Sequence, residues 1–407
     1  MKIPFISKRQ KNNIAENEIL LALDVGTEYI KSAIFQIVDN KVEIIGYARE
    51  KQQSNSMYSA MIVNLDNVIN STDICIGKAL AVADKTLNRQ VEIPKKAIVG
   101  IAGELVKGVT ITVDYDRENP DKKITQKELD EVLDTVKSEL SLKIHQDIAE
   151  EMGLITNQVE EVDTKIVGSK LDGIKLDNPI GFTGAKAEIS VYSIYSPKIH
   201  INSLRELVSR LGLEILDIVV EPYAIARSVK NSHKDSFSGI FIDIGGGTTD
   251  IAIVKNGVVM GTKMFAFGGK VFTKRLMHDF KIDMQEAEQL KLDYTAQKLS
   301  DVKMKKVKES FGKDISIWTE GVELALEEFE DIDIYPDQMF FCGGGSHLPE
   351  IKSGLVSYPW LQVLEFKRFP RMSYIYPNQL DRIIDKTKLM IDPIDVAPGA
   401  LSLMALD

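Results

Sequence analysis

The sequence predicts an α/β protein built from two lobes. The chain has 407 residues, which is too long for one small core and fits two units of the usual domain size. Short apolar runs that close on an aspartate and a glycine turn occur at 20–27 and again at 240–250. A third glycine cluster follows another apolar run, at 339–346. Apolar runs of this length are typical of buried strands, and amphipathic helical segments lie between them.

The composition is that of an ordinary globular protein and argues against several kinds of function. The chain is 44% hydrophobic and 27% charged, and its net charge of −10 with no long basic run in the body predicts no nucleic-acid partner. Only Cys75 and Cys342 occur, both in apolar settings, which favours a reducing cytoplasm over a disulfide framework. Five histidines without repeated ligand spacing argue against a zinc site. No apolar run reaches the length of about 18 residues that crosses a bilayer.

The stretch from Ile240 to Asp250 predicts a hairpin that cradles an anion. An apolar strand ends at Asp243, three glycines follow, and a second strand returns. Glycines have no Cβ, so backbone N–H groups can approach a bulky anion such as a phosphate. The residues expected to contact it are Gly245, Gly246, Gly247, Thr248, Thr249 and Asp250. An ordinary glycine-rich hairpin is the alternative if this stretch is taken alone.

Two further loops share this character. Leu20 to Val25 closes on Asp24, Gly26 and Thr27, and a predicted strand follows from Ile30. The third loop comprises Gly343, Gly344, Gly345 and Ser346. In this order, the three loops resemble the two phosphate loops and the adenosine loop of the actin-like ATPase superfamily. That resemblance implies an actin-like two-lobed ATPase fold that binds ATP and Mg2+ between its lobes.

The resemblance implies a site with few parts. Asp24 and Asp243 are expected to hold Mg2+ largely through water, because this ion is usually bound by one or two carboxylates together with phosphates. Backbone N–H groups of Gly26, Thr27 and Gly245 to Thr248 are expected to hold the β- and γ-phosphates. Gly343 to Ser346 would let the adenosine approach the backbone. Lys31 follows the first loop closely enough either to reach the nucleotide or to cap its own strand.

Glu221 is the predicted catalytic residue. The segment Glu221-Pro222-Tyr223-Ala224 starts a helix with proline in the first turn, where its missing N–H costs little. It resembles the Glu-Pro-x-x-Ala segment of chaperone and MreB relatives, in which the glutamate faces the water next to the γ-phosphate. Glu221 is therefore expected to orient or polarise that water. The alternative is that it only complements the helix dipole.

Two segments after the central hairpin are also predicted to contact the nucleotide. Gly269 and Lys270 open a helix that follows the strand Gly257 to Phe267. Glu288 and Lys291 lie three residues apart and hence on one helix face. In relatives, an acid and a lysine with this spacing contact the ribose and adenine. A solvated helical ion pair is the alternative for this pair.

The region 104–183 departs from the standard first lobe. It is predicted to hold a strand at Val109–Asp114 and a helix after Thr125, with Glu128 in a capping box. It ends in the motif Asn-Pro-x-Gly-x-x-Gly at 178–184. This strand-helix-strand insert resembles the displaced subdomain of FtsA, the actin homologue of bacterial cell division. The predicted fold is thus actin-like with a FtsA-type inserted subdomain.

The resemblance to FtsA implies partners and a location. It implies a protein that forms homopolymeric filaments, binds the FtsZ C-terminal peptide and other division proteins, and links the FtsZ ring to the inner face of the cell membrane at the division site. Slow ATP hydrolysis would serve as a switch. FtsA relatives usually carry a linker and an amphipathic helix at the C-terminus, whereas this chain stops at Asp407, directly after a segment predicted as the last core element. The tether is therefore expected in the N-terminus or in a partner.

The N-terminal segment 1–18 is basic and predicted to be mobile. Within Met1–Lys11, three apolar side chains stand beside four basic ones. One interpretation is a weak membrane-surface anchor held by apolar groups and anionic lipids. The other is a frayed basic terminus.

Two other classes of function share these motifs. A pilus-assembly adaptor of the PilM type uses the same insertion site and binds ATP and a peptide of an inner-membrane protein. A small-molecule kinase would need an acidic catalytic residue and a sugar-sized pocket between the lobes.

The expected domain boundaries follow from these motifs. They are 1–18 for the N-terminal segment, 19–103 and 186–238 for the first lobe, 104–185 for the insert, 239–281 and 336–407 for the second lobe, and 282–335 for a helical subdomain that closes over the nucleotide.

Overall fold

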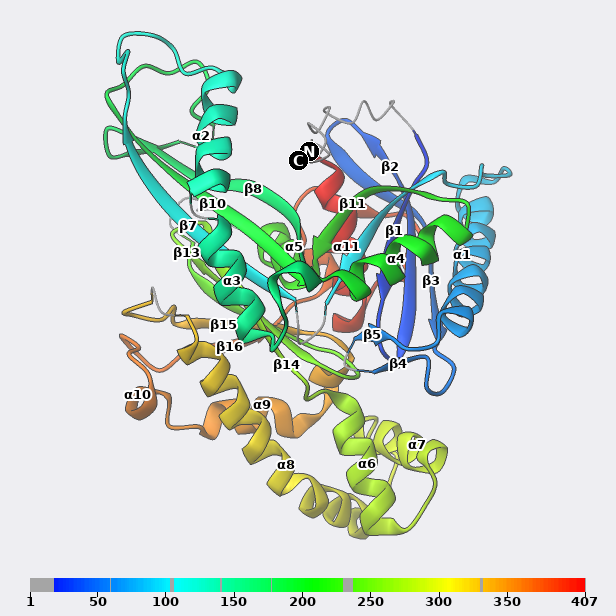
Figure 1. Ribbon diagram of the computed structural model, residues 1–407. Coiled ribbons are helices and arrows are strands. Elements are labelled where there is room, and N and C mark those ends of the chain that lie inside the picture. Colours follow the sequence, from blue (N-terminus) through cyan, green and yellow to red (C-terminus); the bar gives the residue numbers. More distant parts are fainter. Residues whose placement is uncertain are drawn as a thin grey trace.

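Two large β-sheets with helices between and around them form the body of the molecule (Figure 1). The computed structural model describes residues 18–406 except 59, 103–105, 140, 177, 230–236 and 330–331. The predicted N-terminal anchor Met1–Lys11 lies outside the described residues.

In the described part of the chain, the first sheet has six strands. Their order is β11 (Glu214–Val220), β6 (Lys96–Ile101), β1 (Leu20–Val25), β2 (Tyr29–Val38), β3 (Lys41–Lys51) and β17 (Ile383–Asp385). β1 and β2 pair antiparallel, which confirms the predicted strand-turn-strand at the first glycine loop. β6 runs parallel to β1, and β11 runs parallel to β6. The short hairpin β4 (Met57–Tyr58) and β5 (Met61–Ile62) stands apart from this sheet.

The second sheet has nine described strands. Their order is β16 (Arg371–Tyr374), β15 (Gln338–Cys342), β12 (Gly239–Ile244), β13 (Thr249–Lys255), β14 (Val258–Phe265), β7 (Lys107–Asp116), β10 (Lys186–Pro197), β8 (Val159–Leu171) and β9 (Ile174–Leu176). β12 and β13 pair antiparallel, as predicted for the central hairpin. β14 and β7 join through Gly261 opposite Val109 and Thr262 opposite Gly108. This pairing connects the strands of the predicted insert with those of the second lobe.

β10 is the strand that follows the predicted insert in sequence. It pairs antiparallel with both β7 and β8, so it lies inside the sheet that these insert strands form. The domain boundaries given above remain predictions.

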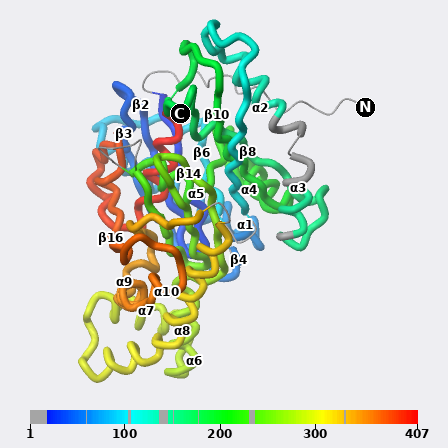
Figure 2. The backbone as a smooth tube through the Cα atoms, turned by 90° about the vertical axis from the view of Figure 1, so that its left-hand side faces the viewer, coloured from blue at the N-terminus to red at the C-terminus, as the bar shows by residue number. Residues whose placement is uncertain are grey.

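Helices cover the sheets and extend both ends of the molecule. They are α1 (Leu65–Leu87), α2 (Gln126–Glu139), α3 (Ser141–Glu151), α4 (Lys198–Arg210), α5 (Glu221–Ser228), α6 (Gly269–Phe280), α7 (Met284–Thr295), α8 (Asp301–Glu327), α9 (Pro349–Ser357), α10 (Trp360–Val363) and α11 (Val396–Leu403). α5 and α11 pack against each other between the two sheets. α2 stands at one end, and α6, α7 and α8 form the other (Figures 1 and 2).

Apolar side chains form separate cores within this arrangement. One core fills the first sheet and its contacts with α1, α5 and α11. A second lies between β12, β13 and β15 and the helices α6 to α9. The insert has its own small core around Leu129, Leu171 and Ile189. The first core also takes in Phe241, Ala252 and Cys342 from one face of the second sheet, while the second core covers the other face.

A buried arginine, Arg117, connects several segments of the insert and was not identified from the sequence. Thr125 Oγ1 accepts a hydrogen bond from the Glu128 backbone N–H at 3.3 Å, which is half of the predicted capping box. The Glu128 carboxylate binds Arg117 instead of the helix start, with Nε at 2.6 Å and Nη2 at 3.0 Å. Arg117 also donates to the carbonyl oxygens of Lys122 and Gly184. The Glu128 carboxylate gains more from pairing with this buried guanidinium than from a second capping hydrogen bond at an exposed helix end.

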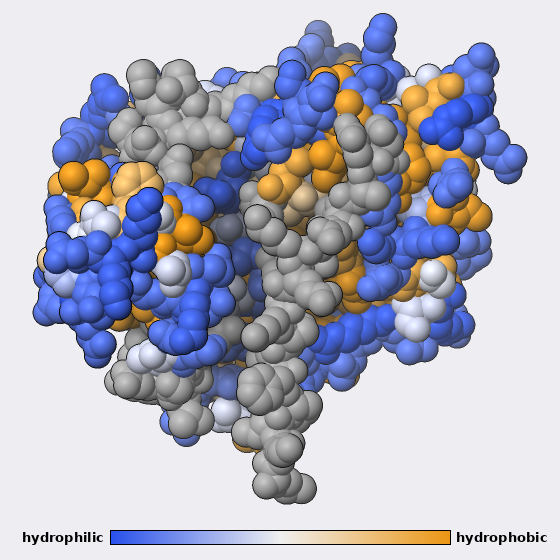
Figure 3. Space-filling view, turned by 90° about the horizontal axis from the view of Figure 1, so that it is seen from above, coloured by the Kyte–Doolittle hydropathy of each residue, from blue (hydrophilic) through white to orange (hydrophobic). Residues whose placement is uncertain are grey.

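The surface seen from above is largely hydrophilic, with apolar residues in separate patches (Figure 3). Among the described residues, no helix combines the length and the apolar character needed to pass through a bilayer.

Candidate nucleotide site

The two predicted phosphate loops touch each other although they are far apart in sequence. A Cβ placed on Gly246 would lie 2.8 Å from Glu28 Cβ, and one on Gly247 would lie 2.9 Å from Thr27 Oγ1. Side chains at these glycines would push the loops apart. The β1–β2 turn of the first sheet therefore faces the β12–β13 turn of the second.

Four buried carboxylates gather behind these loops. Asp24, Asp243, Asp250 and Glu221 are each less than a tenth exposed. Burial and the nearby Asp24 raise the pKa of Asp243 to about 6. Burial and Asp243 raise the pKa of Asp250 well above its usual range, and burial and Asp24 do the same for Glu221. Repulsion between the ionised carboxylates contributes to these raised pKa values. A bound cation would reduce the repulsion and stabilise the ionised forms.

Lys31 places an ammonium group among these carboxylates. Its Nζ lies 2.6 Å from Asp24 Oδ2. Burial alone lowers the pKa of Lys31, but Asp24 and Asp243 outweigh it and raise the pKa above its ordinary value. Lys31 supplies one positive charge, whereas the four carboxyls carry up to four negative charges. A further cation would therefore stabilise the ionised cluster.

The residues present fit a magnesium ion that shares its ligands with phosphates. Among the described residues, no three His, Cys, Asp or Glu side chains form a metal site by themselves. Mg2+ does not need one, because it keeps several waters and uses one or two carboxylates plus phosphate oxygens. Asp250 Oδ1 is buried without a hydrogen-bond partner in the described chain, which marks an unsatisfied acceptor beside the loops.

Lys270 connects the two loops across the lobes. Its backbone N–H donates to Gly246 O at 2.8 Å, while its Nζ donates to Thr27 O at 3.0 Å and pairs with Glu28 at 3.0 Å. Gly269 donates its N–H to Gly245 O at 2.9 Å. The predicted helix start at Gly269 is therefore docked directly on the central glycine loop.

The third glycine loop packs against the end of β12. β15 runs parallel to β12, which places Cys342 opposite Asp243. Gly343 has φ +81°, and a Cβ there would lie 2.1 Å from Asp243 Oδ1. A Cβ on Gly345 would lie 2.4 Å from Ile244 Cγ2. Glycine at 343 lets the loop come this close to the Asp243 carboxylate, and glycine at 345 lets it pack against Ile244.

Glu288 and Lys291 are not a solvated ion pair. Lys291 Nζ lies 2.8 Å from Glu288 Oε2 and donates to Gly269 O at 3.1 Å and Thr273 Oγ1 at 2.8 Å. Both side chains are mostly buried. Burial opposes ionisation of Glu288, but Lys291 and Thr273 outweigh it and lower the pKa of this carboxyl. The pair therefore belongs to the same assembly as Gly269 and its neighbour Gly345.

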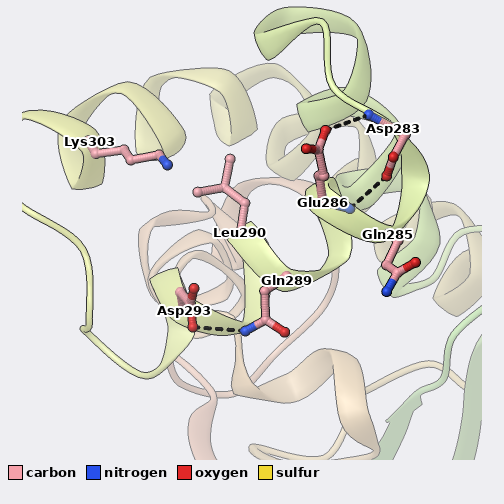
Figure 4. A pocket seen from close by; sticks show the side chains of 7 residues that line it. All are labelled: Asp283, Gln285, Glu286, Gln289, Leu290, Asp293 and Lys303. Carbon is pink, nitrogen blue, oxygen red and sulfur yellow. Dashed lines mark hydrogen bonds between the residues drawn. The ribbon is translucent and has the colours of Figure 1, made fainter.

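A cavity of about 420 Å³ lies on the other side of α7 (Figure 4). It is lined by Asp283, Gln285, Glu286, Gln289, Leu290, Asp293 and Lys303. At 100° per residue, the lining positions of α7 face away from Glu288 and Lys291. This cavity is therefore distinct from the assembly of glycine loops.

Two predicted contact residues point elsewhere in this structure. The Thr249 hydroxyl donates to Phe267 O at 2.6 Å and accepts from Trp318 Nε1 at 2.9 Å, so it faces α8. The Ser346 hydroxyl donates to Gly343 O at 2.7 Å within its own loop. Thr248 Oγ1 stays at the central loop, where it donates to Asp250 Oδ2 at 3.1 Å.

Three residues at the site were not predicted from the sequence: Glu28, Thr273 and Trp318. Glu28 follows Gly26 and Thr27 directly and could have been found as the next loop residue. Thr273 lies one helical turn after Gly269, so the helix period places it on the same face. Trp318 lies in the middle of α8, and no local pattern indicates its bond to Thr249.

The chain is similar in sequence to known cell division proteins. The family described as Cell division protein FtsA matches residues 240–360. The FtsA of Neisseria meningitidis serogroup B is 24% identical over 280 residues, which cover 69% of this chain and 62% of that protein. The FtsA of Bacillus subtilis is 28% identical over 280 residues, which cover 68% of this chain and 58% of that protein. The matches thus span less than two thirds of the length of these relatives.

A solved structure extends the likeness to almost the whole chain. The PilM-PilN type IV pilus biogenesis complex superposes with a TM-score of 0.67 at 15% identity, covering 95% of this chain and 98% of the other. An identity this low shows the fold alone. The predicted actin-like fold is confirmed, and the chain is similar to the FtsA cell division proteins over about two thirds of its own length.

Proposed function

We propose that the protein binds ATP with Mg2+ between its two lobes and uses the bound nucleotide to control assembly in cell division. The observation that carries this proposal is the convergence of three glycine loops on Asp24, Asp243 and Lys31. Loops from both sheets contribute, so a ligand bound there would join the lobes. We expect the bound nucleotide to favour one arrangement of the lobes and so to change the outer surfaces.

The site residues would have distinct roles. Asp24 and Asp243 would hold Mg2+, and Lys31 would contact the phosphates. Backbone N–H groups of both phosphate loops would hold the phosphate oxygens. Gly343 to Ser346 would lie against the adenosine, and Glu288 with Lys291 would hold the ribose end. The bound ion would supply charge neutralisation for phosphoryl transfer, which depends on positioning and charge more than on covalent chemistry.

Glu221 would orient the attacking water. Its carboxylate is buried at the first turn of α5, next to Asp24. A Cβ on Gly100 would lie 2.4 Å from Glu221 Oε1, so the side chain has little freedom to leave this position. Burial and Asp24 raise the pKa of Glu221, which favours its protonated form relative to an exposed carboxyl. Slow hydrolysis of ATP would then reset the assembly.

The FtsA relatives support cell division as the process. Their name gives the process only. We further propose that the protein polymerises, binds the FtsZ C-terminal peptide and reaches the membrane at the division site, as the resemblance to FtsA implies. The fold of the PilM-PilN complex supports a second candidate, an adaptor in pilus assembly. A binding assay with an FtsZ C-terminal peptide and a PilN peptide separates the two. Tighter binding of the FtsZ peptide supports the division role, and tighter binding of the PilN peptide supports the adaptor role.

Filament formation should depend on the metal-site carboxylates. Purified protein with ATP and Mg2+ should form filaments in negative-stain electron microscopy, and Asp24→Ala should form none because the phosphates lose their bridging cation. Asp73→Ala on the exposed face of α1 is the matched control and should assemble like the wild type. Assembly of Asp24→Ala at the wild-type level would contradict the metal-site assignment.

The basic N-terminus is our proposed contact with the membrane. Deleting residues 1–11 should abolish sedimentation with vesicles that contain anionic lipid, because both the apolar and the basic groups are removed. Raising the salt concentration should weaken binding of the full chain. If the shortened chain sediments with vesicles as well as the full chain, the contact lies elsewhere.

A further inference from the structure

A column of stacked side chains connects the insert to the helix that carries Glu221. Tyr192 on β10 stacks flat on Tyr223 of α5, with ring centroids 4.8 Å apart and an interplanar angle of 8°. Lys165 on β8 places its Nζ 5.6 Å from the centre of the Tyr223 ring. Tyr192 also hydrogen-bonds Thr262 on β14 at 3.1 Å. We call Lys165, Tyr223, Tyr192 and Thr262 the tyrosine column.

Both ends of the tyrosine column are anchored to strands outside the insert. Lys165 pairs with Asp217 at 3.2 Å, and Asp217 lies on β11 of the first sheet, the strand that leads into α5. At the other end, Thr262 lies at the place where β14 meets β7. The column thus touches the insert, the first sheet and the second sheet.

The side chains of the tyrosine column are buried and closely packed. Tyr192 and Thr262 are fully buried and Tyr223 is 2% exposed. A Cβ on Gly108 of β7 would lie 2.0 Å from Tyr192 Oη, so the strand passes only because this residue is glycine. A shift of β8 and β10 relative to the first sheet would therefore move the Tyr223 ring as well.

Movement of Tyr223 bears directly on Glu221. The two residues lie in the same first turn of α5, which is only eight residues long. Glu221 Oε1 occupies the space that a Cβ on Gly100 would need, so a small rotation of α5 would displace the carboxylate. The Asp217 partner of Lys165 lies four residues before Glu221 on the same connection.

We propose that the tyrosine column couples the orientation of the insert to the position of Glu221, with Lys165 and Tyr223 as positioning residues. This inference rests on the proposed function, because it assumes a nucleotide beside Glu221. A partner that binds the insert would then change the nucleotide site, and by reciprocity a bound nucleotide would reorient the insert. Plain core packing would give the same contacts but no such coupling.

A distance measurement in the full chain tests the coupling. The substitutions Lys127→Cys on α2 and Lys305→Cys on α8 in one chain provide two sites for nitroxide labels, since these lysine side chains are 87% and 79% exposed. The native Cys75 and Cys342 are buried, and burial raises the pKa of Cys75 to about 11, so neither competes for the label. Double electron–electron resonance with and without ATP and Mg2+ should show a shifted distance in the wild type.

The variants separate coupling from packing. Lys165→Met should remove at least about half of the shift while the Kd for ATP stays within about threefold, and Lys165→Arg should restore the shift. Tyr192→Phe, which removes only the bond to Thr262, serves as a second variant if Lys165→Met melts early. An unchanged shift in both variants, or no shift in a wild type that binds ATP, would overturn the inference. Absence of ATP binding to the wild type would instead refute the proposed function and the inference with it.

Discussion

Replacing Asp243 by asparagine should stabilise the nucleotide-free protein and abolish its binding of Mg2+-ATP. Burial and Asp24 raise the pKa of this carboxyl from 3.8 to about 6 in the folded state. Because the folded state pays for ionising it, Asp243→Asn should raise the free energy of unfolding at pH 7 by about 1 to 3 kcal/mol. Urea denaturation in EDTA measures the gain, and calorimetry with Mg2+-ATP measures the lost binding.

The pH dependence of this gain has a definite sign. A carboxyl whose pKa is raised on folding binds protons more tightly in the folded state, so its contribution to stability falls as pH rises from about 4 through about 6. The advantage of Asp243→Asn should therefore shrink when the pH is lowered from 7 to 5. Asp73→Asn on the exposed face of α1, outside the carboxylate cluster, is the control variant. A variant less stable than the wild type at pH 7 would contradict the account of a strained carboxylate cluster.

Placing alanine at Gly343 should cause a large loss of both stability and nucleotide binding. The residue has φ +81°, which disfavours any side chain, and its Cβ would lie 2.1 Å from Asp243 Oδ1. Backbone strain and overpacking together should cost roughly 3 kcal/mol or more. Thermal denaturation followed by circular dichroism measures this loss, and titration with ATP measures the binding.

The adjacent glycine provides the matched control. A Cβ on Gly344 would first meet the tip of the Ile394 side chain, at 3.2 Å, and its φ is not in the left-handed region. Gly344→Ala should therefore cost no more than about 1 kcal/mol. Equal losses for the two variants would show that the close approach of Gly343 to Asp243 is not what the loop requires.

Much of the fold could be predicted because local patterns coincide with tertiary contacts. Apolar residues at helical spacing over 66–90 coincide with α1, in which Asn64 is the N-cap and accepts from the Asn67 N–H, and Asn88 lies in the left-handed region at the helix end. Pro222 in the first turn marked the start of α5 in the same way. The bond of Arg117 to Glu128 could not be predicted, because a capping box and a buried ion pair compete for the same carboxylate.

The loops of the site were visible in the sequence, but their mutual contacts were not. Glycine turns after apolar strands mark Gly26, Gly246 and Gly343 as loop residues. Which of them touch depends on how two sheets face each other, and no local spacing carries that information. The bridge from Lys270 to Glu28 and the bond from Trp318 to Thr249 are of this kind. Thr249 and Ser346 were predicted to contact the nucleotide, but their hydroxyls donate to carbonyl oxygens within the protein.

The central claim is that loops from both sheets converge on one Mg2+-nucleotide. Isothermal titration calorimetry of the folded protein with ATP tests it most directly. Binding should depend on Mg2+, with a Kd tighter than about 1 mM, and should be lost on addition of EDTA. A folded protein that shows no heat of binding with millimolar ATP and Mg2+ would contradict the claim.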